Sequence, residues 1–263
     1  MLRRLWKLVA FVTVAVGYTL YAGVAVRLKL SSRERARAMA RHQQRGTRLL
    51  LRILGVRVRV KGGPLEHWAR ARPTLLVSNH LGLLDPFVLA SQVQAALVGK
   101  AEIDDWPAAG WVARTMGVLF VERGHSGAVK GFVERVQERL RDGVSVLAFP
   151  EGTTNERPQV LPFKTGVFSG VAGQKGEVVL PLYLHVRSVD GRPARVGEER
   201  RRVIWAGGTE PGLAHAWRLL ALRRVVMEVR VGEPIDAGEH GRRALARRAQ
   251  RQVEAMAEGA LGG

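Results

Sequence analysis

The order of apolar and polar positions predicts strands that alternate with helices. Short apolar runs, which are typical of buried strands, lie at 75–77, 116–121, 144–149, 178–184 and 225–231. Residues 56–61 instead alternate valine with arginine or lysine, which is the period of a half-buried strand. We therefore expect an α/β fold in which a mostly parallel sheet is flanked by helices.

Apolar residues at helical spacing predict helices between these strands. Asp85 followed by Pro86 is typical of an N-cap with proline at the first helical position. A second helix is expected to end at Asp142-Gly143, and a third, near the C-terminus, has a very basic outer face. The apolar positions that define the last two are Val129, Phe132, Val133, Val136 and Leu140, then Leu245, Ala249, Val253, Met256 and Ala260.

The N-terminal segment is predicted to anchor the chain in a membrane. Residues 8–26 are 19 positions without a charge, and a helix of that length covers roughly 28 Å, about one hydrocarbon core. We expect a helix that spans or inserts deeply, with an interfacial helix or a cleaved signal peptide as the alternatives. More arginine and lysine follows the segment than precedes it. This predicts an inner or cytoplasmic membrane location with the larger part of the chain facing the cytoplasm.

A second, basic helix is expected directly after this anchor. Ser31 and Glu34 form a capping box at its start, and Gly55 ends it. Its first half is rich in arginine, which indicates either a juxtamembrane helix on anionic head groups or a solvated face. We place the one domain boundary here, between residues 1–55 and 56–263.

The net charge of +19 implies an anionic partner, which is a nucleic acid, an anionic lipid or a phosphorylated substrate. The sequence has no zinc-finger spacing and no RNP-like run, so we expect no specific nucleic-acid binding. It also has no cysteine, which excludes disulfides and thiolate catalysis. None of its seven histidines forms a close metal-binding pair such as HExxH, so no metal site is expected. A non-catalytic basic protein that binds anionic lipid or nucleic acid remains the alternative to an enzyme.

His80 and Asp85 are the first candidates for chemistry, because they follow the strand predicted at 75–77. Residues five apart on one continuous helix point about 140° away from each other. If the two side chains touch, His80 must therefore lie in the loop before the helix. Asp85 would then fix one ring nitrogen and leave the other as a base. The alternative is a structural histidine beside a helix cap.

Three later features could bind an anion. Arg123 follows a predicted strand, where it would hold a phosphate through two hydrogen bonds or form a surface ion pair with Glu122. Backbone amides around Gly152 would bind an anion or oxyanion, or form an ordinary turn. Lys164 is a further possible anion ligand. The sequence has no GxSxG, Walker A or GxGxxG motif, so a serine acyl-enzyme and a nucleotide site are unsupported.

Taken in order, four segments between about residues 75 and 185 resemble the glycerolipid acyltransferase family typified by 1-acyl-sn-glycerol-3-phosphate acyltransferase. The family's NHxxxxD motif falls on Asn79, His80 and Asp85, its second motif on Phe120 and Arg123, its FPEGT motif on 149–153, and its proline-containing strand on 179–182. The pattern is specific because all four segments occur together.

This resemblance implies that residues 56–263 form a membrane-bound O-acyltransferase domain. Such an enzyme moves a fatty acyl group from acyl-ACP or acyl-CoA to the free hydroxyl of 1-acylglycerol 3-phosphate, giving phosphatidic acid. By the resemblance, His80 would deprotonate that hydroxyl and Asp85 would orient His80, with no metal or tightly bound cofactor. The residues expected to bind substrate are Asn79, Phe120, Arg123, Glu151, Gly152, Thr153 and Lys164.

Two positions depart from the family pattern. The family usually has serine where this chain has Gly82, and arginine where it has Thr154. Losing an arginine from a phosphate pocket removes a charge-assisted hydrogen bond, worth roughly 1.5–3 kcal/mol. Lyso-ornithine lipid, which is a zwitterionic acceptor, or another lysophospholipid therefore stays open as the acceptor.

Overall fold

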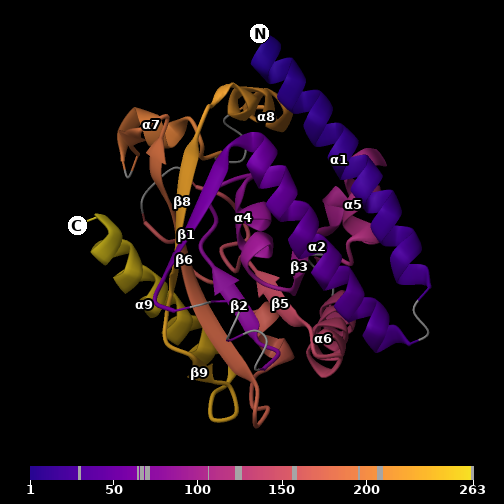
Figure 1. Ribbon diagram of the computed structural model, residues 1–263. Coiled ribbons are helices and arrows are strands. Elements are labelled where there is room, and N and C mark those ends of the chain that lie inside the picture. Colours follow the sequence, from indigo (N-terminus) through magenta and orange to yellow (C-terminus); the bar gives the residue numbers. More distant parts are fainter. Residues whose placement is uncertain are drawn as a thin grey trace.

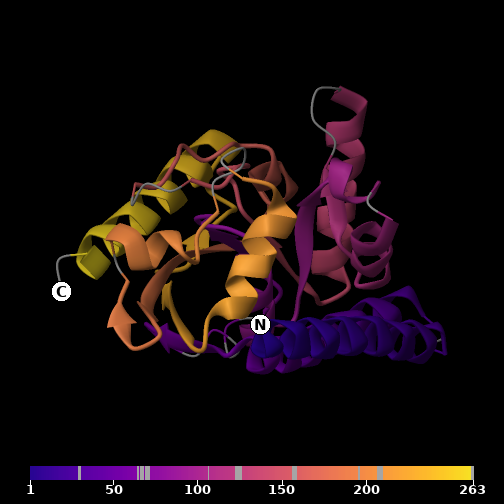
Figure 2. The same cartoon turned by 90° about the horizontal axis from the view of Figure 1, so that it is seen from above.

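The chain forms one twisted sheet with helices on both faces, seen in the computed structural model of Figures 1 and 2. The structure describes residues 1–28, 31–63, 65, 68, 72–105, 107–121, 126–155, 159–194, 196–205 and 210–261. The strand order is β1-β8-β6-β2-β5-β3-β4, and β7 and β9 each pair with β6. The strands are β1 (Val56–Lys61), β2 (Leu75–Ser78), β3 (Ala95–Lys100), β4 (Leu119–Val121), β5 (Ser145–Ala148), β6 (Val178–Val189), β7 (Arg192–Pro193), β8 (Val225–Val231) and β9 (Ile235–Asp236).

All pairs in this sheet are parallel except those that β6 makes with β7, β8 and β9. The expected α/β class with a mostly parallel sheet is therefore confirmed. Pro181 lies in β6 between the part that pairs with β9 and the part that pairs with β8. Since proline has no N–H to donate, a change of partner is a position where a central strand tolerates it.

Helices cover the two faces of the sheet and bury a core on each. On one face α6 and α9 pack over the strands, on the other α4 and α8 do so, and α2 contributes to both cores. The helices are α1 (Leu2–Arg27), α2 (Ser32–Leu54), α4 (Asp85–Gln92), α5 (Pro107–Thr115), α6 (Ser126–Arg141), α7 (Gly197–Arg201), α8 (Gly212–Ala221) and α9 (Arg242–Leu261), with short 3-10 turns η1 (Ala101–Ile103) and η2 (Val167–Gly170).

Some boundaries differ from the sequence expectation. The strand predicted at 116–121 begins only at Leu119, because α5 runs to Thr115 and Gly117 turns the chain at φ +73°. The N-cap of α4 is Leu84, and Asp85 is already helical. The prediction that Asp85 caps this helix was therefore wrong, and its carboxylate is used elsewhere. Strand β3 and helix α5 were not predicted.

The two N-terminal helices lie side by side against the rest of the molecule (Figures 1 and 2). Ser31 and Glu34 form the predicted capping box of α2, and Gly55 ends that helix at φ +77°. The ammonium of Lys7 in α1 is buried and donates to the carbonyls of Leu54 and Leu222, at 2.6 and 2.8 Å. By length and composition α1 suits a membrane span, although it packs on α2, α5 and α8. Its anchoring role and the boundary near Gly55 stay predictions.

Candidate active site

Two neighbouring parallel strands bring the first and third motifs together. β2 and β5 pair in parallel, so the loops after Ser78 and Ala148 leave the same edge of the sheet. The backbone N–H of His80 donates to Oε1 of Glu151 at 3.1 Å. The His80 ring stacks on Phe149, with centroids 4.3 Å apart and planes 20° apart. The carboxyl ends of parallel strands thus place an imidazole and a carboxyl group in one site.

His80 and Asp85 make the contact that the sequence predicted. Nδ1 of His80 lies 2.7 Å from Oδ2 of Asp85. The same oxygen accepts from the N–H groups of Leu81 and Gly82, so the loop wraps around one buried carboxylate. Asp85 is 1% exposed and His80 is 22% exposed. Because Asp85 occupies Nδ1, Nε2 is the nitrogen of this oriented imidazole that can act as the base.

Asn79 holds this loop to the next strand. Its Nδ2 donates to the carbonyl of Leu184 at 2.9 Å, and its Oδ1 accepts from the N–H of Leu184 at 2.7 Å. The side chain is 4% exposed. These contacts give Asn79 a positioning task on β6, and its predicted contact with substrate stays a prediction.

Gly82 has a steric reason to lack a side chain. The N–H of Trp205 donates to the carbonyl of Leu81 at 2.9 Å, which brings the 203–205 segment across the loop. A Cβ on Gly82 would lie 2.9 Å from the Trp205 nitrogen and 3.3 Å from its Cβ. The serine that is usual in the family would therefore require this segment to shift. The departure at Gly82 matches the close packing of Trp205 on this loop.

The carboxyl group of Glu151 is buried beside the histidine. It is 3% exposed, and within the described part of the chain its Oε2 makes no hydrogen bond. Burial raises the pKa of Glu151 to about 8, and the negative charge of Asp85 acts in the same direction. The amides of His80 and Leu161 oppose this rise. Glu151 is therefore mostly protonated at neutral pH. Its carboxyl group contacts the main chain of His80, and its predicted contact with substrate stays a prediction.

The free energy of unfolding should fall as the pH rises, because folded Glu151 keeps its proton to a higher pH than unfolded Glu151 does. Below the usual Glu pKa of 4.5 both folded and unfolded Glu151 carry the proton. From there to about pH 8 only the folded state keeps it. The free energy of unfolding should therefore fall by up to about 1.4 kcal/mol per pH unit across this window. Glu151→Gln should reduce this slope in denaturant titrations between pH 5 and 9. Glu233→Gln changes an exposed carboxyl group and is the control; equal slopes in the wild type and Glu151→Gln would contradict the assignment.

The other predicted binding residues lie in different surroundings. Gly152 adopts φ +68°, and its N–H donates to the Phe149 carbonyl, so this amide is engaged within the turn. Thr153 is exposed. Lys164 is exposed beside the loop, and its backbone N–H donates to Pro150. Phe120 is half-buried in β4, which lies beyond β5 and β3 at the sheet edge. Arg123 and its neighbour Glu122 lie outside the described residues.

Sequence reasoning missed two residues of the site. Phe149 stacks on His80, and its place in the FPEGT motif was the available signal. Trp205 crosses the loop from more than 100 residues away, with no local pattern to indicate it.

An imidazole oriented by a carboxylate, at the carboxyl edge of a parallel sheet, is an arrangement that can take a proton from a hydroxyl group. The acyltransferase family matches residues 57–185. The chain is 34% identical to a lyso-ornithine lipid O-acyltransferase of Brucella abortus (strain 2308), over 81% of this chain and 80% of that protein. It is 26% identical to a 1-acyl-sn-glycerol-3-phosphate acyltransferase of Neisseria gonorrhoeae, over 63% of this chain and 61% of that protein.

The fold agrees with these sequence matches. The crystal structure of the 1-acyl-sn-glycerophosphate (LPA) acyltransferase PlsC from Thermotoga maritima superposes with a TM-score of 0.64 at 19% identity. The superposition covers 97% of this chain and 95% of that one. The chain belongs to the glycerolipid acyltransferase family and is an acyltransferase.

Proposed function

We propose that the protein is a lysolipid O-acyltransferase whose acceptor is lyso-ornithine lipid. The observation that carries this choice is the likeness to lyso-ornithine lipid O-acyltransferases over most of the chain. Besides the Brucella protein, one from Pseudomonas aeruginosa (strain PAO1) is 32% identical over 91% of this chain and 87% of its own length. Thr154 supports the same choice, because the arginine usual at that position would favour a phosphate.

The geometry accounts for base catalysis of acyl transfer. Nε2 of His80 takes the proton of the acceptor hydroxyl, and the hydroxyl oxygen attacks the carbonyl carbon of the acyl thioester. A C–O bond forms and the C–S bond breaks, and the leaving thiolate receives the proton from His80. Asp85 keeps the ring in place and stabilises its transient positive charge through the 2.7 Å contact.

The donor and the location follow from the same proposal. A thioester of acyl carrier protein or coenzyme A supplies the acyl group, with no tightly bound cofactor. The uncharged face of α1 holds the enzyme at the cytoplasmic or inner membrane, with the catalytic domain in the cytoplasm. The exposed arginines of α2 then lie near anionic head groups. They are Arg33, Arg35, Arg37, Arg41, Arg45, Arg48 and Arg52.

A second acceptor remains in the proposal. The Neisseria relative and the Thermotoga structure are named for 1-acylglycerol 3-phosphate, and their likeness to this chain favours that acceptor, which gives phosphatidic acid. Its phosphate would need cations in place of the arginine missing at Thr154. Lys164 is an exposed cation beside this loop.

An acyl-transfer assay with both acceptors tests this proposal. Purified protein in detergent is offered radiolabelled acyl-ACP or acyl-CoA, with lyso-ornithine lipid and lysophosphatidic acid in parallel. We expect the higher kcat/KM with lyso-ornithine lipid. A preference for lysophosphatidic acid would move the assignment to the second acceptor, and no product from folded protein with either would contradict both.

A further inference from the structure

We infer that the exposed ends of α1 and α8 together form a lipid-docking surface, here called the α1–α8 patch. It consists of Leu2, Leu5, Trp6, Leu213 and Trp217. This inference rests on the proposed membrane function, and it adds a second membrane contact outside the uncharged span of α1. The partner it fits is the head-group boundary of an anionic bilayer.

Helix α8 presents an apolar face that is largely exposed. Leu213 is 87% exposed and Trp217, one turn later on the same face, is 38% exposed. Ala214 and Pro211 are exposed beside them. The opposite side of the helix, with His215 and Leu219, is buried. Exposed large apolar groups that share one helix face indicate an interaction surface.

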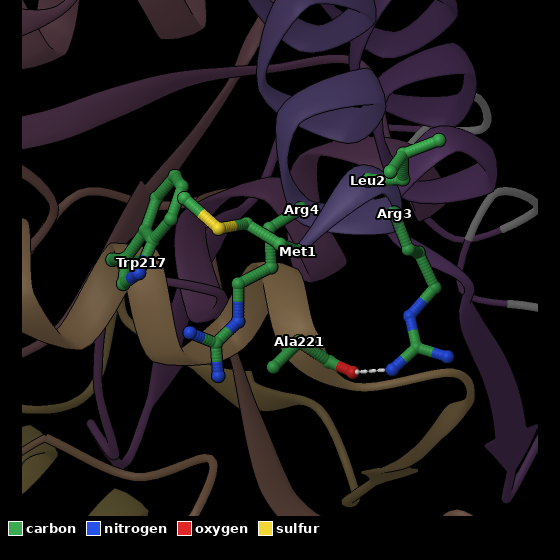
Figure 3. Close-up of a pocket in the computed structure, with 6 residues that line it drawn as sticks. All are labelled: Met1, Leu2, Arg3, Arg4, Trp217 and Ala221. Carbon is green, nitrogen blue, oxygen red and sulfur yellow. Dashed lines mark hydrogen bonds between the residues drawn. The ribbon is translucent and has the colours of Figure 1, made fainter.

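The beginning of α1 lies beside Trp217 on this face. Figure 3 shows Trp217 beside Met1 and Arg4, in a shallow pocket also lined by Leu2 and Ala221. The guanidinium of Arg4 lies 5.6 Å from the Trp217 ring centroid. Leu2, Leu5 and Trp6 are all more than half exposed. From there the uncharged exposed face of α1 continues through Val9, Val12, Val16, Leu20 and Val24.

Composition distinguishes a bilayer from other occupants. Two tryptophans lie among aliphatic side chains, and the cations Arg3 and Arg4 flank them. Tryptophan with arginine is typical of the membrane interface, where the rings lie at head-group depth and the cations meet lipid phosphates. The net charge of +19 favours an anionic surface over a second copy of the same basic chain.

The patch has a direct structural connection to the catalytic loop. Arg3 donates to the Ala221 carbonyl and Lys7 to the Leu222 carbonyl, which joins α1 to the end of α8. At the start of α8, the Trp205 ring stacks on buried His215, with centroids 6.3 Å apart. The backbone of Trp205 donates to Leu81 in the catalytic loop. Docking of the patch therefore sets the orientation of the active site relative to the membrane that supplies the acceptor.

Vesicle binding and vesicle activity test this inference with matched variants. The test variant is Leu213→Ser/Trp217→Ser, with Leu213→Ser alone as the second variant, because Leu213 makes almost no contact that folding needs. Val196→Ser is the control, since Val196 is 62% exposed at the N-cap of α7, outside the patch. Flotation with vesicles of phosphatidylcholine and phosphatidylglycerol in equal amounts measures binding. Turnover is measured with acceptor in those vesicles and in detergent micelles.

The double variant should bind vesicles about tenfold or more weakly, since burying each large apolar side chain contributes to partitioning. Leu213→Ser should show a smaller loss in the same direction, and Val196→Ser none. Turnover should fall with vesicles and persist in micelles. Vesicle binding equal to the control in both variants would overturn the inference. The inference would also be overturned if the variants bound vesicles as the wild type does but lost a dimer that the wild type forms. The patch would then contact a second copy of the chain. Because flotation needs no turnover, absence of acyl transfer in the wild type would contradict the proposed function and leave this test valid.

Discussion

Replacing His80 with alanine is expected to lower kcat/KM by about 10²–10⁴, the usual contribution of a positioned general base. The ring supplies Nε2 as the base, and Nδ1 is held by Asp85 at 2.7 Å. The fold should persist, because the hydrogen bond to Glu151 comes from the His80 backbone, which alanine keeps. The loss should appear in kcat, since the base acts in the transition state.

The measurement is acyl transfer by purified protein, with thermal unfolding recorded on the same samples. His240→Ala is the matched control, because it removes an imidazole before α9. Turnover in His80→Ala within a few-fold of the wild type would exclude His80 as the base. A large fall in the unfolding temperature would show that the loss reflects folding.

A loss of similar size, about 10²–10⁴, is expected from Asp85→Asn. The amide oxygen of asparagine can still accept from Leu81 and Gly82, as the carboxylate does. It carries no charge to stabilise the imidazolium that forms when His80 accepts a proton. Catalysis should therefore fall while the loop keeps its shape.

Asp85→Ala separates the catalytic task from the structural one. Alanine leaves two buried backbone N–H groups without their acceptor, at a cost of roughly 1–3 kcal/mol each. We expect unfolding at lower denaturant concentration for Asp85→Ala than for Asp85→Asn, with comparable loss of turnover. Equal stability of the two variants would contradict the role of Asp85 in holding the loop. Activity of Asp85→Asn near the wild type would contradict its role in orienting His80.

The parts of the fold that sequence predicted are those that depend on local composition. Valine at every second position indicated β1, and its three valines face the core as expected. Ser31 and Gly55 marked the two ends of α2 because a cap and a left-handed turn are local events. Strand β3 went unrecognised, because Ala95–Lys100 ends in Gly99 and Lys100 and has no clear period of two.

For the site, sequence alone determined which residue types occur and in what spacing: His80 and Asp85 after one buried strand and Glu151 after another. That spacing permits the contact between His80 and Asp85 that the structure shows, because a histidine in a loop can reach back to a carboxylate five positions later. Only the tertiary structure decided that Asp85 binds Leu81 and Gly82 and does not cap α4, that Asn79 is held by Leu184, and that Trp205 crosses the loop above Gly82. The contacts of Asn79 and Trp205 join segments more than 100 residues apart. The pairing of β2 with β6 places Leu184 beside Asn79, and no local pattern contains that pairing.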